Sequence, residues 1–304
     1  MTISRRTLLG ASATLVTSGF IATSARLGTP DRGSMSEGLI ARTPDGLNLA
    51  VRSYGDPAHP EILFIHGLGQ SRLSWDLQVN GDLADRFRVV TFDLRGHGDS
   101  DKPLSPSAYS DGDRWADDIQ AVIEATKLRR PLLVGWSLGG LVIGRYLVRY
   151  GAENIAGVNL VDAVTKLSAD LLGAKSLKYA PLLADPDLSV RSGAVADFLV
   201  SCFAIQPPEE ALRRMLVFNG MVPPELHKGV VAISSDGLDD AFAKPEVMLV
   251  TYGGKDALTK REMSTRMLSI NPRAVFSEYP NSGHSPFYEE PQRFNSELEK
   301  LVAA

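Results

Sequence analysis

The chain has 304 residues and a formal net charge of −4. This length is sufficient for one α/β domain with an insertion and a sizeable core. The charge provides no basic face for nucleic acid or anionic lipid, so a small neutral ligand is the better expectation. A single cysteine, Cys202, excludes an internal disulfide, and because it lies in an apolar run we expect it to be buried.

The first 25 residues differ in character from the rest of the chain. Arg5 and Arg6 precede a mildly apolar segment of about 15 residues, which ends in small residues near Ala25. This pattern resembles a twin-arginine signal peptide, which predicts export to the periplasm or the exterior. The apolar run is too short for a stable membrane span. The alternative is a cytoplasmic protein whose translation starts at Met35.

From residue 39 onward, short apolar runs typical of buried strands alternate with helical patterns. The runs predict strands at 47–53, 62–65, 89–92, 132–134, 158–161, 247–250 and 274–277. Helical patterns lie at about 74–85, 113–127, 139–150, 259–270 and 290–302. Such alternation predicts an α/β fold, with a mostly parallel central sheet flanked by helices.

One interval interrupts this alternation. Residues 164–241 contain helical patterns and several prolines but no clear strand, which predicts an inserted helical cap. The core then comprises 39–163 and 242–304, and residues 26–38 form a flexible lead-in. The apolar residues of the cap, together with neighbours of the sequence motifs, predict a largely apolar acyl or alcohol pocket. The candidates for its lining are Trp136, Phe198, Phe203, Met221 and Phe287.

The most informative stretch runs from Leu132 to Ile143. An apolar run meets Ser137, which is flanked by glycines and followed at once by helix-forming residues. This is the pattern of a nucleophile elbow, a tight strand-to-helix turn that exposes a serine hydroxyl. Gly135 and Gly139 provide the room that the close crossing of strand and helix requires.

Three further motifs accompany this elbow in a fixed order. They are His66-Gly67-Leu68-Gly69, the stretch from Phe92 to Ser100, and Gly283-His284 near the C-terminus. With these motifs the chain resembles the α/β-hydrolase superfamily. Within it the chain is similar to the small bacterial serine esterases, a group that also includes cofactor-free haloperoxidases and perhydrolases.

The resemblance implies roles for particular residues. Ser137 would be the nucleophile, and the superfamily order of serine, acid and histidine makes His284 the base. The oxyanion hole would consist of the backbone N–H groups of Leu138 and Leu68. The other histidines lie in a polar turn, in the cap and in two glycine-rich loops.

Two aspartates compete for the role of the acid. Asp162 follows the strand at 158–161, and some members of the superfamily place the acid there. Asp256 follows the next strand, in a loop whose paired glycines allow it to turn back toward His284. One helix and one strand separate Asp256 from His284, which would bring both loops to the same edge of the sheet. We therefore predict Asp256 as the acid and Asp162 as the residue that opens the cap.

These residues predict a serine hydrolase that cleaves small apolar carboxylic esters through an acyl-enzyme, without a cofactor or a metal. Perhydrolysis, lactone hydrolysis and C–C bond hydrolysis are alternatives on the same machinery. A non-enzymatic alternative is a sensor of a small ligand on this fold. Since Ser137 stands where epoxide hydrolases and haloalkane dehalogenases carry aspartate, neither of those activities is expected.

Overall fold

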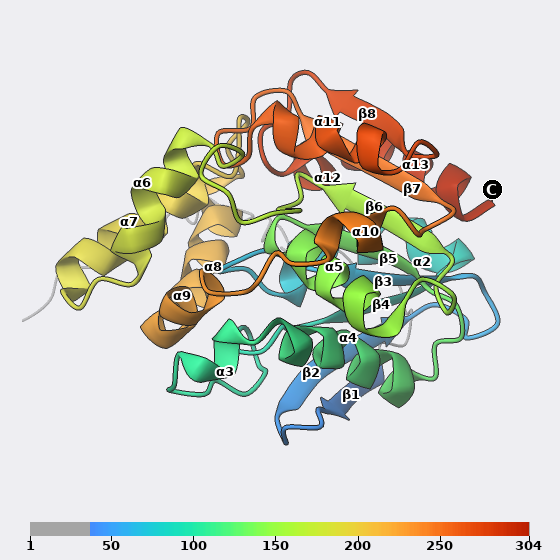
Figure 1. The fold of residues 1–304 in the computed structure, drawn as a ribbon, viewed down its shortest axis with the longest axis horizontal. Coiled ribbons are helices and arrows are strands. Elements are labelled where there is room, and N and C mark those ends of the chain that lie inside the picture. Colours follow the sequence, from blue (N-terminus) through green and yellow to red (C-terminus); the bar gives the residue numbers. More distant parts are fainter. Residues whose placement is uncertain (1–36, 304) are drawn as a thin grey trace, which may run out of the picture. The chain divides into compact units, whose positions relative to one another are not determined.

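The computed structural model of the chain describes residues 37–303. The proposed signal peptide lies outside the described residues. Within them, one sheet of eight strands has the order β1-β2-β4-β3-β5-β6-β7-β8 (Figure 1). The strands are β1 (Glu37–Arg42), β2 (Asn48–Tyr54), β3 (Glu61–Ile65), β4 (Arg88–Phe92), β5 (Leu132–Trp136), β6 (Gly157–Val161), β7 (Met248–Gly253) and β8 (Val275–Tyr279).

All neighbouring strands from β4 to β8 in this order are parallel, whereas β1 pairs with β2 and β2 pairs with β4 in antiparallel fashion. The predicted α/β fold with a mostly parallel sheet is therefore confirmed. Strand β1 is an addition to the prediction, and it begins at Glu37, inside the segment that we expected to be a lead-in. Gly38 of that segment also belongs to this strand.

Helices cover both faces of the sheet (Figure 1). The helices that precede β6 in the chain are η1 (Arg72–Trp75), α1 (Asp76–Val79), α2 (Leu83–Arg86), α3 (Ser107–Ser110), α4 (Gly112–Thr126) and α5 (Leu138–Tyr150). After β7 follow α11 (Arg261–Ile270), α12 (Pro286–Glu289) and α13 (Pro291–Ala303). The single helix expected at 74–85 is wrong: the run Asn80-Gly81-Asp82, which favours a turn, divides it into η1, α1 and α2.

Successive side chains of a strand point to opposite faces of the sheet, so the apolar core lies on both faces. In β3, Leu63 and Ile65 pack on one side with α4 and α5, while Ile62 and Phe64 pack on the other side with α13. All five residues of β3 are buried, as expected for a strand in the middle of a parallel sheet.

Between β6 and β7 the chain forms five helices. They are α6 (Ala174–Leu183), α7 (Leu188–Val200), α8 (Glu209–Gly220), α9 (Pro224–Val230) and α10 (Leu238–Phe242). We call residues 174–242 the helical insertion. Helices α6 to α9 lie together beside the sheet, whereas α10 packs on α5 (Figure 1). Within residues 37–303, no helix is both long and apolar enough to cross a membrane.

Candidate active site

Ser137 is the single residue between β5 and α5, and its backbone is strained. Its φ of 53° and ψ of −115° lie in a region that residues other than glycine rarely adopt. The surroundings hold this conformation, because the Ser137 N–H donates to the Val161 carbonyl at 3.0 Å. A Cβ on Gly135 would lie 2.7 Å from the carbonyl oxygen of Gly139, so β5 and α5 cross as closely as the sequence pattern predicts. A Cβ on Gly139 would in turn lie 2.4 Å from the carbonyl oxygen of Ile65 in β3.

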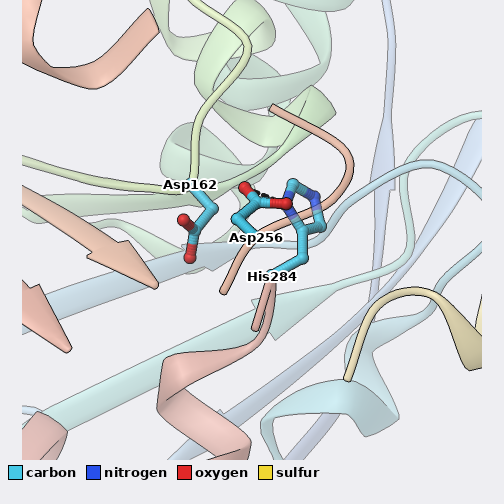
Figure 2. A group of neighbouring side chains, drawn as sticks. All are labelled: Asp162, Asp256 and His284. Atoms are coloured by element: carbon cyan, nitrogen blue, oxygen red, sulfur yellow. Dashed lines mark hydrogen bonds and ion pairs between the residues drawn. The ribbon is translucent and has the colours of Figure 1, made fainter. Parts of the chain in front are cut away.

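His284 and Asp256 come from two neighbouring loops, after β8 and β7 respectively. The Nδ1 of His284 lies 2.8 Å from Oδ2 of Asp256, and both side chains are buried (Figure 2). Within the described residues, Nε2 of His284 has no hydrogen-bond partner. The ring therefore donates from Nδ1 to the carboxylate, and its Nε2 is left as a free acceptor.

Asp256 is held by four hydrogen-bond donors. Its Oδ1 accepts from the N–H groups of Leu258 at 2.7 Å and Thr259 at 3.2 Å. Its Oδ2 accepts from the Thr259 hydroxyl at 2.5 Å as well as from His284. Burial acts to raise the pKa of Asp256, but His284 and the other donors outweigh it and hold that pKa below its usual value. Asp256 is therefore a carboxylate at neutral pH.

The two loops are joined to each other and to the strand before Ser137. The N–H of Lys255 donates to the carbonyl of Ser282 at 2.9 Å. The indole Nε1 of Trp136 donates to the carbonyl of His284 at 2.6 Å. His284 is thus fixed both to the loop of Asp256 and to the residue that precedes Ser137.

Asp162, the competing aspartate, lies on the other side of Asp256 (Figure 2). Carboxylate or ring atoms of Asp162, Asp256 and His284 all lie within 4.8 Å of one another. Oδ1 of Asp162 accepts from the Gly253 N–H at 2.9 Å, while its buried Oδ2 has no partner among the described residues. Burial and the charge of Asp256 raise the pKa of Asp162 well above its usual value, so of the two carboxyl groups Asp162 is the one that takes up a proton first.

These three side chains also form a geometric candidate for a cation site. His284 and Asp256, however, bond directly to each other through Nδ1 and Oδ2, and Asp256 is further held by N–H and hydroxyl donors. The arrangement suits a histidine oriented by a carboxylate better than a metal centre.

Two backbone N–H groups flank Ser137 without acceptors. A Cβ on Gly67 would lie 3.1 Å from Cβ of Ser137, which puts the loop of Leu68 directly beside the serine. Leu138 is the first residue of α5. Within residues 37–303, neither the N–H of Leu68 nor that of Leu138 donates a hydrogen bond to the protein. Both are available to a developing negative charge.

Two buried histidines hold the loop of Leu68, a role that the sequence did not reveal. Nε2 of His97 accepts from the Gly69 N–H at 3.1 Å, and Nε2 of His66 accepts from the Leu94 N–H at 3.0 Å. Burial lowers the pKa of His66 to about 4 and that of His97 well below its usual value. Both rings are therefore neutral, and each accepts at Nε2.

The five predicted pocket residues lie in different environments. Trp136 and Phe287 are buried in an aromatic cluster, with ring centroids 4.8 Å apart. Phe198 is buried in α7, and Phe203 packs edge-on against a tyrosine ring. Met221 is 46% exposed and lines an apolar cleft of about 260 Å³ beside α8. Cys202 is buried, as predicted.

Comparison with known proteins identifies the family. The model of the Alpha/beta hydrolase family matches residues 62–297, most of the described chain. The chain belongs to this family. Its fold and its relatives make this alpha/beta hydrolase an enzyme of the hydrolase class.

Several relatives are esterases by name. A solved structure of a candidate aryl esterase from Burkholderia cenocepacia is 40% identical, with a TM-score of 0.84, over 88% of this hydrolase and 98% of that chain. An esterase from a Rhodococcus species is 29% identical, with a TM-score of 0.80, over 88% and 98% of the two chains. A bifunctional esterase/perhydrolase from Acinetobacter calcoaceticus is 28% identical over 84% of this chain and 96% of its own.

Proposed function

We propose that the protein is a serine hydrolase of small, apolar carboxylic esters that works through an acyl-enzyme. Ser137 Oγ attacks the ester carbonyl while Nε2 of His284 takes the hydroxyl proton. Asp256 holds the ring in the required tautomer and stabilises the imidazolium. The N–H groups of Leu68 and Leu138 bind the oxyanion.

The steps that complete acylation and then release the acid use the same groups. His284 returns its proton to the departing alcohol, which leaves the acyl group on Ser137. A water molecule then attacks this acyl-enzyme and gives a proton to His284. When the second tetrahedral intermediate collapses, the bond between the acyl carbon and Ser137 Oγ breaks, His284 gives its proton to that oxygen, and the carboxylic acid is released.

The observation that carries this proposal is the bond between His284 and Asp256, which leaves Nε2 of His284 as a free acceptor. A histidine with this bonding has Nε2 free to act as a base toward a group that approaches it. The strained turn at Ser137 and the unpaired N–H groups beside it supply the other parts of an acyl-transfer site.

Perhydrolysis is the second candidate, favoured by the bifunctional esterase/perhydrolase among the relatives. In that reaction hydrogen peroxide attacks the acyl-enzyme in place of water, and the product is a peroxycarboxylic acid. The first half-reaction and its residues are unchanged. Measuring peroxyacid formation against acid formation from one ester therefore separates the two candidates.

The direct test combines covalent labelling with turnover. A fluorophosphonate probe should label the wild-type protein, and the Ser137→Ala variant should remain unlabelled. Ser264→Ala is a matched control, because Ser264 is a buried serine on α11 outside the loops of this site. Turnover is then measured on p-nitrophenyl esters of graded chain length. A folded wild-type protein that neither reacts with the probe nor hydrolyses esters would favour the ligand sensor.

A further inference from the structure

Glu289, at the end of α12, joins the loop of His284 to the helical insertion. Its Oε1 accepts from the Gly283 N–H at 2.8 Å. Its Oε2 accepts from the N–H groups of Ala204 at 3.0 Å and Ile205 at 2.7 Å, in the segment between α7 and α8. One carboxylate thus binds the residue before His284 and two residues of the insertion.

Direct packing connects the same two segments. A Cβ on Gly283 would lie 2.6 Å from the backbone nitrogen of Ala204 and 3.1 Å from the backbone carbon of Phe203. The rings of Phe203 and Tyr288 pack edge-on, with centroids 5.4 Å apart. The histidine loop is therefore in close backbone contact with the insertion at Gly283, and α12 contacts the insertion through Tyr288, so a shift of the insertion disturbs both.

The chemistry of this contact requires a carboxylate. Each oxygen of Glu289 faces only backbone donors from its segment, and a charged acceptor makes the stronger bonds to N–H groups. Burial raises the pKa of Glu289, while the N–H groups oppose that rise. An amide has one acceptor oxygen, so a glutamine would necessarily turn its NH₂ group toward the N–H donors of one segment.

We propose that Glu289 is a positioning residue that couples the placement of the helical insertion to the orientation of His284. The inference rests on the proposed function, since it concerns the base of that reaction. Displacement of the segment 201–208 then disturbs His284, and displacement of the histidine loop disturbs the insertion, because coupling between two sites is reciprocal. A substrate that displaces the insertion therefore shifts the base as well, through Glu289 and the packing around it.

The informative variant is Glu289→Gln, and Glu290→Gln is its matched control. Oε1 of Glu290 accepts from the Ser282 hydroxyl at 2.7 Å. The control therefore loses a charge beside the same loop, without a bond to the insertion. Comparison of the two variants separates coupling from simple stabilisation of the histidine loop.

The measurements are steady-state kinetics on short and long p-nitrophenyl esters and amide hydrogen exchange of residues 201–208 and 281–286. In Glu289→Gln we expect kcat to fall about tenfold, because either the part-buried Gly283 N–H or the N–H groups of Ala204 and Ile205 lose their carboxylate acceptor. Exchange should accelerate at least about tenfold in both segments, and the ratio of KM values for long and short esters should change. In Glu290→Gln, exchange of residues 201–208 and the KM ratio should equal those of the wild type.

Two outcomes would overturn the coupling. Faster exchange in both segments with unchanged kcat and KM ratio would make Glu289 a structural clamp only. A fall in kcat with unchanged exchange of residues 201–208 would confine its action to the histidine loop. If Glu289→Gln does not fold, Gly283→Ala replaces it, because the added Cβ pushes against Ala204 while Glu289 is retained; it should show the same paired changes.

The exchange experiment also keeps this inference separate from the proposed function. A wild-type protein without ester turnover refutes the function. Exchange that is unchanged in both variants refutes the link between the segments, whatever the reaction is.

Discussion

Replacement of Asp256 by asparagine should switch His284 to its other neutral tautomer. Oδ1 of Asp256 faces two backbone N–H donors, so an asparagine will keep its oxygen there and present its NH₂ group to His284. Nδ1 of His284 then becomes an acceptor, and its proton moves to Nε2. In that tautomer Nε2 cannot accept the proton of Ser137. We expect kcat to fall by about 10³–10⁴, with the fold preserved.

Asp162→Asn is the matched control for this prediction. Its oxygen can keep the bond to the Gly253 N–H, and its NH₂ group replaces a neutral acid beside Asp256. The change should cost less than about tenfold in kcat, because the bond to His284 is untouched. Both variants are compared at saturating p-nitrophenyl ester and about pH 7–8, with circular dichroism as the check on folding. A larger loss in Asp162→Asn would refute the assignment of Asp256 as the acid.

Other expected outcomes follow from the same structure. Ser137→Ala should fold normally and lose about 10⁴-fold or more in turnover; near-normal turnover would end the serine mechanism. Gly139→Ala should lower the free energy of unfolding by about 1–3 kcal/mol, because its Cβ would meet a backbone oxygen at 2.4 Å. Gly193→Ala, a helical position with no atom near its added Cβ, should instead stabilise by about 0.5–1 kcal/mol; equal urea midpoints for the two variants would contradict this reasoning. Because the pKa of Asp162 is raised in the folded protein, this side chain holds its proton above about pH 4, where the unfolded chain has lost it. The stability that Asp162 contributes is therefore lost as the pH rises from about 4 toward its raised folded-state pKa. Asp162→Asn lacks this loss, and its melting temperature relative to wild type should therefore increase between about pH 4 and pH 7; a constant difference would refute the neutral state of Asp162. If the N-terminal arginine pair directs export, N-terminal sequencing of the native protein should find a mature chain that begins near Arg26, whereas a start at position 35 would refute export.

The sequence was most informative where local pattern and long-range packing agree. The run Ile62-Leu63-Phe64-Ile65 is apolar on both faces and is a buried central strand. The glycines around Ser137 predicted that β5 and α5 cross closely, and the structure has this close crossing. By contrast, β1 lies at the edge of the sheet, and its short apolar run of residues 39–41 is only partly buried, with Ile40 62% exposed, so it lacks the pattern of a central strand.

The sequence pattern alone did not predict the contacts between segments that are distant in the chain. The sequence suggested that the loops of Asp256 and His284 share one edge, but not that Asp162 lies close to Asp256 on the other side. Nor did it reveal Glu289, because the donors that this carboxylate binds are backbone groups, which every residue carries. The only available signal was a glutamate five residues after the predicted base, and glutamates are common on helix ends.

The two neutral histidines beside the proposed oxyanion hole, His66 and His97, restrict the thermal motion of the loops that they join. An imidazole reaches as far as a glutamine amide but has two rotatable bonds where glutamine has three. Nδ1 of His66 and of His97 also lies within 3.0 Å of a backbone carbonyl oxygen, that of Gly67 and Arg95 respectively. Each ring is therefore bonded to the main chain through both of its nitrogen atoms. Because burial holds both pKa values below their usual range, neither ring takes up a proton near neutral pH, and its contacts stay the same there. The N–H groups that we propose as oxyanion donors would thereby be held in place before any substrate arrives, with little reorganisation left for the chemical step.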